Sequence, residues 1–497
     1  MNNFRIYFLF SLSIYKAKMS SDSMVFRLKD SVDDLASANE GMSKYSYDQI
    51  QTASGTGTGD TFSNGQLRFR WEHASNKWWF PSKSYLQMRL KFTKANGATQ
   101  LDLADKLAPN MDVCASLFQQ AEFQIGGKTV SKIGEYLPQV DVLKKRMTKP
   151  KSWLDGIGKS SMFMQPKGEE RKQEVVSDPQ RLGNDFDVAP ADEAEIIANF
   201  SGVGKTRGVS SFGLTWQPPL SIFDVDVLPG GKYELILTPE SVANFKKFAV
   251  EQNGAAGAQK VPGVAGDYDV SVESIFFYVC SADADRLDDK EYYIDLQSCK
   301  LTLGSSTLTA GTVQQQFDVS PSTSALTVAF QDTRAGFDTR ISRTKLISIA
   351  NLSGAGGTNL DAVATKNFTR ADLGIRRLFV SYAGQNQPIP DANPKFIPGT
   401  DHLIRRYTES QLNTGMYWSE GSPESIEDFI ARGPYYHFNF PKDPTDKSTR
   451  VSVHTTLATP AAGDLTNTNL LLFEHYKQVA RIVLSQGRVV DVRLEDA

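Results

Sequence analysis

The stretch QLRFRWE at residues 66–72 alternates apolar and polar side chains with a period of two. In an extended chain its leucine, phenylalanine and tryptophan lie on one side, and its two arginines and Glu72 lie on the other. The stretch YLQMRLKF at residues 85–92 repeats this pattern. Strands of this kind bury one face in a core and expose the other face to water. We therefore expect a chain built mainly from half-buried β-strands.

Further segments carry the same alternation and predict further strands. They are residues 121–125, 232–237, 268–280, 326–330, 376–382, 435–440 and 450–457. Near the end of the chain, ARIVLSQGRVVDVRL at residues 480–494 predicts a hairpin that turns at Ser485, Gln486 and Gly487.

Helices are expected to be few and short. Glu135–Met147 places its apolar residues on one stripe with helical spacing. Thr238 and Pro239 form an N-cap followed by a first-turn proline, and Ser422 and Pro423 open a similar segment. Strands and helices do not alternate regularly along the chain, which disfavours a doubly wound α/β enzyme fold.

Long connections rich in glycine, proline and asparagine separate the strands at residues 251–267, 351–366 and 383–400. Strands joined in this way are typical of β-sandwiches. The acidic stretch SADADRLDDKE at 281–291 follows a strongly apolar strand and marks a boundary. We therefore expect an all-β chain with two sandwich units, residues 45–285 and residues 286–497, each large enough to bury a core. Residues 1–44 would form an N-terminal leader or arm that is partly disordered.

Composition narrows the function classes. The chain has 497 residues, 40% of them hydrophobic and 22% charged, and a formal net charge of −3. A protein whose main task is to grip nucleic acid would carry a basic face, and neither end of this chain has a basic arm. The three cysteines, Cys114, Cys280 and Cys299, are widely spaced, which predicts free thiols in a reducing compartment.

The N-terminus has three interpretations. Ile6–Tyr15 is an apolar run after Arg5, too short to span a bilayer, and no small-residue cleavage site follows it. We favour an over-extended reading frame or a disordered leader for residues 1–18, ahead of a secretion signal and a membrane-touching segment. Glycosylation motifs at Asn199, Asn351 and Asn367 matter only if the protein is secreted.

The segment NFSGVGKT at residues 199–206 resembles a phosphate-binding loop without satisfying its pattern. That loop requires a glycine where Asn199 stands, and a helix after the threonine to hold the phosphate. Here Arg207 opens a run of strand and turn residues instead. We interpret the segment as a glycine-rich loop between two strands, with Gly202 and Gly204 in turn positions.

Other candidate sites are weak. The five histidines form no metal-binding motif; they are His73, His402, His437, His454 and His475. His437 and His454 fall on predicted strands opposite the apolar face, where we expect solvated or loop-bonded side chains. The acidic residues from Asp283 to Glu291 lack the spacing of a calcium loop and are expected to form a solvated linker.

Aromatic residues gather at Trp78-Trp79-Phe80, Tyr407, Tyr417-Trp418 and Tyr435-Tyr436. We expect them to fill the core or a subunit contact rather than to stack sugars or bases. A pair of carboxylates for glycoside hydrolysis stays open, because such residues meet only in three dimensions. The sequence therefore assigns no catalytic, cofactor-binding or metal-binding residue.

Four segments together resemble the double jelly-roll major capsid proteins of DNA viruses, of the virophage and Polinton-like type. They are residues 78–92, 116–143 with the Gly126-Gly127 turn, 214–237 and 433–453. The segment LTWQPPLSIFDVDVLPGGKYELIL at 214–237 carries most of the resemblance.

The resemblance implies two consecutive eight-stranded jelly rolls in one chain. It further implies homotrimeric, pseudo-hexagonal capsomers that tile an icosahedral virion shell assembled inside the host cell. Neighbouring capsomers, a penton protein and minor capsid proteins would be its partners. The resemblance also implies that the chain has no enzymatic role, no cofactor and no small-molecule substrate, and that it recognises no specific nucleic-acid sequence. In that setting Gln385–Gly399 would form an outward or inter-subunit loop, in which prolines lower the ordering cost of a contact.

Two alternatives belong to other classes. A secreted β-sandwich that binds glycans or acts as an adhesin requires the N-terminal run to be a working signal. A nucleotide hydrolase or a β-sandwich glycosidase requires a site that the sequence does not show. Analysis of the native N-terminus by mass spectrometry and an assay of ATP binding distinguish these classes from a capsid protein.

Overall fold

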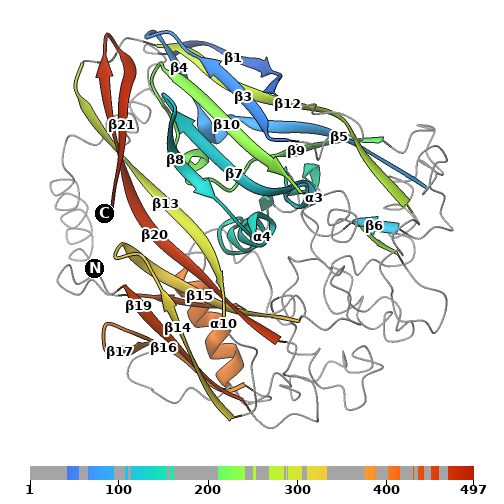
Figure 1. Ribbon diagram of the computed structural model, residues 1–497, viewed down its shortest axis with the longest axis vertical. Coiled ribbons are helices and arrows are strands. Elements are labelled where there is room, and N and C mark those ends of the chain that lie inside the picture. Colours follow the sequence, from blue (N-terminus) through green and yellow to red (C-terminus); the bar gives the residue numbers. More distant parts are fainter. Residues whose placement is uncertain are drawn as a thin grey trace, which may run out of the picture.

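A computed structural model describes a large part of the chain. The described residues are 42–54, 65–94, 107–109, 113–150, 152–153, 157–161, 211–240, 250–252, 268–284, 287, 289–304, 311–332, 375–387, 401–414, 429, 435–440, 449–457 and 468–496. Their strands pair in an antiparallel manner in four main sheets. Figure 1 shows these sheets as two bodies, one above the other.

The upper body consists of two five-stranded sheets from the first half of the chain. One has the order β1-β12-β5-β9, with β4 beside β12. Its strands are β1 (Met42–Ile50), β4 (Lys77–Trp79), β5 (Tyr85–Lys94), β9 (Ser211–Trp216) and β12 (Tyr268–Ala284). The other has the order β2-β3-β10-β7-β8, built from β2 (Thr52–Ser54), β3 (Leu67–Glu72), β7 (Phe118–Ile125), β8 (Lys128–Ile133) and β10 (Lys232–Pro239). A separate ribbon pairs β6 (Leu107–Pro109) with β11 (Val250–Gln252).

The lower body comes from the second half of the chain. Its five-stranded sheet has the order β13-β20-β15-β18, with β21 beside β20. The strands are β13 (Glu291–Leu303), β15 (Thr323–Asp332), β18 (Tyr436–Asn439), β20 (Thr468–Ser485) and β21 (Arg488–Asp496). The facing four-stranded sheet has the order β14-β19-β16-β17, built from β14 (Gly311–Asp318), β16 (Ile375–Tyr382), β17 (Gln385–Gln387) and β19 (Arg450–Leu457).

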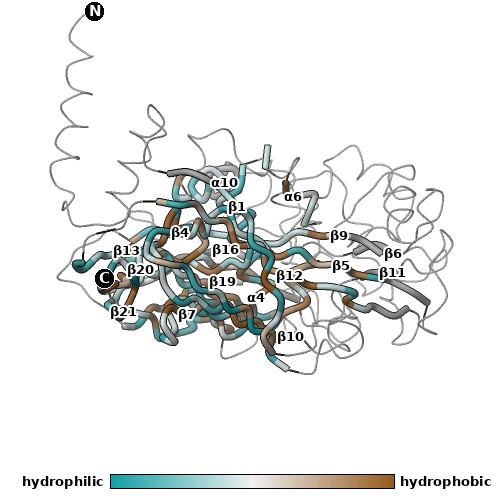
Figure 2. Tube along the Cα trace, turned by 90° about the horizontal axis from the view of Figure 1, so that it is seen from above, coloured by the Kyte–Doolittle hydropathy of each residue, from teal (hydrophilic) through white to brown (hydrophobic). Residues whose placement is uncertain are grey.

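The all-β fold class is confirmed, and each strand predicted from alternation is present. The hairpin of β20 and β21 turns at Gln486 and Gly487, which have φ angles of 54° and 71°. Two successive positive φ angles define the turn that matches the twist of a tight hairpin, and glycine adopts such an angle without steric cost. Figure 2 shows hydrophobic and hydrophilic residues alternating along many strands, as the sequence pattern requires.

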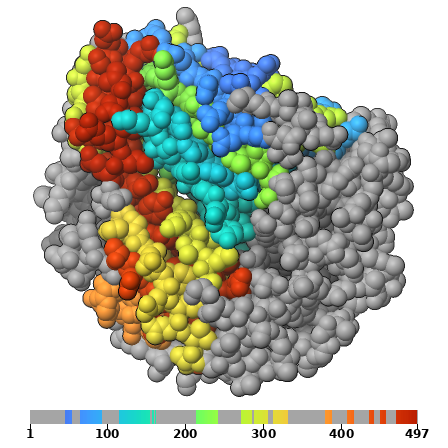
Figure 3. Space-filling model, viewed as in Figure 1, coloured from blue at the N-terminus to red at the C-terminus, as the bar shows by residue number. Residues whose placement is uncertain are grey.

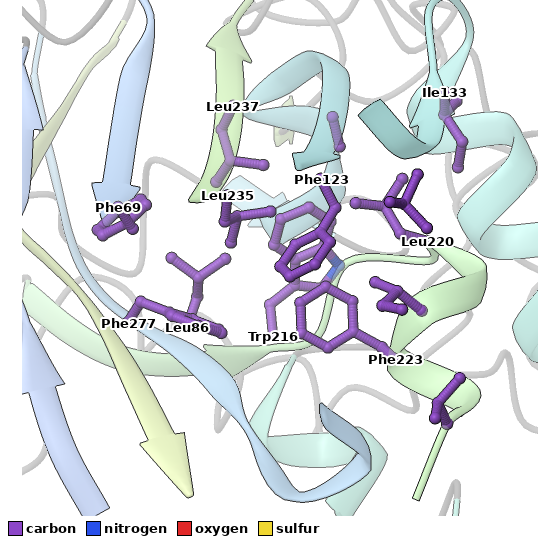
Figure 4. Packing of buried hydrophobic residues seen from close by; sticks show 14 of the residues in the cluster. Phe69, Leu86, Phe123, Ile133, Trp216, Leu220, Phe223, Leu235, Leu237 and Phe277 are labelled. Atoms are coloured by element: carbon purple, nitrogen blue, oxygen red, sulfur yellow. The ribbon is translucent and has the colours of Figure 1, made fainter. Parts of the chain in front are cut away.

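The core of the upper body lies between its two sheets. Aromatic rings dominate it: Trp79 packs on Phe123 with ring centroids 5.2 Å apart and on Trp71 at 5.0 Å. The indole Nε1 of Trp79 donates a hydrogen bond to Ser84 Oγ at 2.8 Å, so this buried polar atom is satisfied. Figure 4 shows Phe123 and Leu235 of one sheet facing Leu86 and Phe277 of the other.

The first part of β20, residues 470–474, is buried on both faces. Leu470 and Leu472 point into the core between the two lower sheets, whereas Leu471 and Phe473 belong to the cluster that continues into the upper body. A strand covered on both sides loses its alternation and becomes a continuous apolar run, here NLLLF. One hydrophobic cluster therefore extends from the upper body across the inner sheet of the lower body.

Helices in the described residues are short. They are α3 (Val113–Ser116), α4 (Leu137–Thr148), α6 (Ile157–Ser160) and α10 (Asp401–Asn413), with 3₁₀ turns η2 (Pro81–Lys83) and η5 (Ser221–Asp224). The helix predicted at Glu135–Met147 is confirmed as α4, whereas α10 was not predicted. A helix start at Thr238 is wrong, because β10 continues through Pro239 and pairs Thr238 with Gln120 of β7.

Several expectations fall outside the described residues. They concern the N-terminal run, the NFSGVGKT segment, residues 241–249, most of the segment opened by Ser422, and residues 388–399 of the proline-rich loop. Among the described residues, the helices are all too short or too polar to cross a membrane.

Candidate functional site

Helix α4 lies between the two bodies and contacts both (Figure 1). The guanidinium of Arg146, a residue only 1% exposed, lies 5.1 Å from the centre of the Tyr435 ring in the lower body. Met147 Sδ accepts a hydrogen bond from Thr327 Oγ1 of β15 at 3.8 Å. The apolar stripe predicted for this helix, which includes Leu137 and Val140, is buried. The helix thus places side chains from the first half of the chain into contact with the second half.

A buried ion pair anchors α4 to the upper body. Lys145 Nζ donates to Asp141 Oδ2 at 2.9 Å, and Trp216 Nε1 donates to the same oxygen at 2.7 Å. Asp141 is 1% exposed and Lys145 is 6% exposed. A charged pair removed from water requires such additional hydrogen bonds to offset its lost hydration. The sequence pattern alone did not identify this pair.

The C-terminal hairpin attaches the lower body to the upper body a second time. Val489 N donates to Gly230 O at 2.9 Å, and Lys128 Nζ of β8 lies 2.5 Å from Asp491 Oδ1. Arg488 also pairs with Glu72 of β3. Figure 3 shows the C-terminal strands in red beside the strands coloured cyan. Two polar contacts and a main-chain bond therefore join segments that are far apart in the sequence.

Two histidines form a buried polar cluster in the inner sheet. Thr327 Oγ1 lies 2.8 Å from His437 Nδ1 and 2.8 Å from His475 Nε2, and His437 Nε2 lies 3.1 Å from Asn439 Oδ1. Burial lowers the pKa of His437 to about 4. Burial and the neighbouring His437 lower the pKa of His475 to about 3. Both rings are therefore neutral at pH 7.

The expectation of a solvated His437 is wrong. Ser410 Oγ of α10 accepts a hydrogen bond from His437 N, and Asn413 Nδ2 donates to His437 O at 2.9 Å. Helix α10 thus bonds the edge of β18, whereas the His437 ring lies on the sheet face where Thr327 contacts both this ring and Met147 of α4. His454 is half-buried, and its ring stacks on Phe379 with centroids 4.4 Å apart.

A cavity of about 450 Å³ opens beside α4. Its lining includes Lys144 and Lys149 from this helix, Trp153, Tyr47 of β1 and Thr215 of β9. Pockets of roughly 300–1,000 Å³ are the size that usually holds a ligand or a peptide side chain. No local sequence pattern predicts this cavity, because its walls come from segments more than 150 residues apart.

The remaining sequence candidates in the described residues are the acidic stretch and the cysteines. No group of three or more histidine, cysteine or acidic residues is placed to hold a metal among the described residues. Within the acidic stretch, Asp289 Oδ1 accepts a hydrogen bond from Gly487 N, and Glu291 pairs with Arg481. The three cysteines are free, as predicted.

The aromatic clusters that fall in the described residues fill the core. Trp78, Trp79, Phe80, Tyr435 and Tyr436 are all buried. An exposed platform for sugars or bases requires ring faces that are open to water, which these residues do not provide.

Comparisons with known proteins locate this fold. No family model matches the chain, and no curated protein matches its sequence. The chain is similar to a chain of the Sputnik virophage, with a TM-score of 0.57 and 13% identity over 92% of this chain and 89% of that chain. It is also similar to the mavirus major capsid protein (TM-score 0.49, 12% identity, 90% of each chain). The Faustovirus major capsid protein matches with a TM-score of 0.47 and 10% identity, over 89% of this chain and 90% of that chain.

The match to the Sputnik chain extends over almost the whole length of both chains. At 13% identity the match is one of fold, and it agrees with the two stacked pairs of antiparallel sheets described above. The chain therefore has the double jelly-roll fold that the sequence resemblance predicted.

Proposed function

We propose that this chain is a structural major capsid protein of a DNA virus, located in the virion shell and without an enzymatic role. The fold and the near-complete structural match to a virophage chain support this proposal. The glycan-binding or adhesin alternative receives no support from the comparisons.

One structural observation carries the proposal: the two rolls are joined as a single building block. The shared cluster across β20 includes Leu471 and Phe473, and α4 and the C-terminal hairpin add polar contacts. A shell subunit must keep its two rolls at a fixed spacing, because each neighbour in the shell meets both of them. A continuous core provides this rigidity, since protein interiors are close-packed and transmit strain.

Three such chains would place six rolls around one axis and give a pseudo-hexagonal capsomer that tiles an icosahedral shell. We propose neighbouring capsomers, a penton protein and minor capsid proteins as partners. We also propose residues 45–285 and 286–497 as the two rolls, behind an arm at residues 1–44. The placement of every strand of the upper sheets before residue 285, and of every strand of the lower sheets after residue 290, supports this division in the described residues.

Light scattering coupled to size-exclusion chromatography tests the proposal directly. A trimer has a mass of about 165 kDa, three times the 54.9 kDa of one chain. Negative-stain images of the same fraction should show particles with a six-fold outline. A monomer that persists at micromolar concentration over a wide range of salt and pH would contradict the proposal.

A further inference from the structure

The cavity beside α4 carries an excess of positive charge. Four lysines and two aspartates line it: Lys83, Lys144, Lys145, Lys149, Asp141 and Asp224. Lys144 pairs with Asp224 at 2.5 Å, and Lys145 pairs with Asp141 at 2.9 Å. In the part of the chain that the structure describes, neither Lys83 nor Lys149 forms an ion pair. Two cations of the cavity therefore lie outside ion-pair distance of the described carboxylates.

These two lysines lie against aromatic rings instead. Lys149 Nζ is 5.7 Å from the centre of the Trp153 ring, and Lys83 Nζ is 5.1 Å from the rings of both Tyr45 and Phe80. A ring face stabilises a cation less than a desolvated carboxylate with good geometry does. The arrangement holds the ammonium groups in place and leaves them able to bind an anion.

The charged form of Lys149 is destabilised by its surroundings. Burial lowers the pKa of its ammonium group below the ordinary value, and the neighbouring Lys144 adds to the effect. An unpaired cation that is partly removed from water is costly, and a carboxylate placed beside it would offset that cost.

The rim of the cavity is apolar and faces water. Ile157 is 69% exposed and Tyr47 is 53% exposed, which makes them two of the large hydrophobic side chains most exposed among the described residues. Both line the cavity, with Trp153 between the apolar rim and Lys149. An occupant that covers this surface must therefore present apolar atoms next to its negative charge.

We propose that this cavity binds an acidic peptide segment of a partner protein. Carboxylates of the segment meet Lys149 and Lys83 separately, and a neighbouring apolar side chain packs on Trp153 and Ile157. A strand of nucleic acid fits less well, because phosphate binding requires a run of cations along a groove, whereas here Asp141 and Asp224 interrupt the lysines. The site is independent of trimer formation, so its failure and the failure of the capsid role are separable.

Fluorescence anisotropy on the full-length chain tests this site. The probe is a labelled peptide of alternating glutamate and leucine, and its matched control contains lysine in place of glutamate. We expect the glutamate peptide alone to bind, and Lys149→Met and Ile157→Ser each to weaken it by about tenfold or more. Lys300→Met, at an exposed lysine of β13 that does not line the cavity, should leave the affinity unchanged.

A readout at the site itself is provided by Trp153, whose fluorescence should change when the peptide binds and whose contribution is removed in Trp153→Phe. Equal binding of the two peptides, or an affinity that Lys149→Met does not alter, would overturn the proposal. So would the absence of binding of the glutamate peptide at about 1 mM, the weakest affinity that a specific site of this size should show. Displacement of the bound peptide by a single-stranded oligonucleotide at lower concentration would assign the cavity to phosphate instead.

Discussion

The guanidinium of Arg488 in β21 donates a hydrogen bond to the carboxylate of Glu72 in β3, across 416 positions of the sequence. Beside this pair, Val489 N donates to Gly230 O, and the backbone of Gly230 bridges to Arg488 in parallel register. The last strand of the second roll is therefore aligned with a turn of the first roll by its main chain. Side-chain charges add to a contact that backbone geometry has already set.

Replacement of Gly230 by alanine should disrupt this contact. A Cβ atom at Gly230 would lie 2.1 Å from Ala74 O, a backbone atom that cannot turn away. We expect Gly230→Ala to destabilise the protein by about 1–3 kcal/mol or more, as overpacking does elsewhere, and to loosen the C-terminal hairpin. Hydrogen exchange of the β21 amides and thermal unfolding measure the two effects. Gly213→Ala is the matched control, because a Cβ atom there meets nothing within 4 Å; equal effects of the two substitutions would contradict this account.

The Asp141–Lys145 pair should be essential to the position of α4. Asp141→Asn removes the buried carboxylate that accepts from both Lys145 Nζ and Trp216 Nε1, and breaking a buried pair in this way typically costs about 3–5 kcal/mol. We expect a large drop in the unfolding temperature. The double variant Asp141→Asn, Lys145→Met should recover part of it, since it also removes the buried ammonium group. Asp224→Asn, at a half-exposed carboxylate that pairs with Lys144, should change little; a comparable loss there would show that burial is not the cause.

Much of the fold follows from local pattern. The alternation in QLRFRWE predicts β3 because one face of that strand meets the core and the other meets water. The turn at Gln486 and Gly487 is likewise a property of the residues themselves. For these elements, local preference and tertiary packing agree.

The features that were missed arise from contacts between distant segments. Asp141, Lys145 and Arg146 are buried because α4 lies between two bodies, and no spacing within the helix records that. The His437 ring is buried on the sheet face where Thr327 meets Met147 of α4, and α4 comes from a distant part of the chain. Thr238 and Pro239 have the chemistry of a helix start, yet pairing with β7 keeps them extended, and a bulge next to Pro239 accommodates its missing N–H.

The buried histidines predict a loss of stability between pH 7 and pH 4. The pKa values of His437 and His475 are about 4 and about 3 in the folded protein, against 6.5 in an unfolded chain. As the pH falls through 6.5 the unfolded chain takes up protons that the folded chain does not, so the free energy of unfolding decreases until about pH 4. His73, whose pKa is also lowered to about 4 by burial, contributes in the same direction.

Thermal unfolding midpoints measured from pH 7 to pH 5 check this prediction. His475→Gln should reduce the slope of stability against pH, because one titrating group is lost. Thr327→Val is the control: it removes the hydroxyl that both rings contact but keeps the rings, so it should lower stability and preserve the slope. An unchanged slope in His475→Gln would refute the assignment.

The ion pairs at the junction of the two rolls should affect the stability of the folded state in a separate, more acidic pH range. The hydrogen bond from Arg488 lowers the pKa of Glu72, and the one from Lys128 lowers the pKa of Asp491. Carboxylates with lowered pKa values stabilise the folded state above their unfolded values, near 4, and this contribution disappears as the pH falls through the folded values. All four side chains are partly exposed, between 29% and 56%, so the effect at neutral pH is small and decreases with added salt. The double variant Glu72→Gln, Asp491→Asn should therefore match the parent protein at pH 7 in moderate salt and differ from it in the acid transition below pH 4, as followed by circular dichroism. A large loss of stability at pH 7 would mean that these charges, rather than the backbone contact at Gly230, hold the two rolls together.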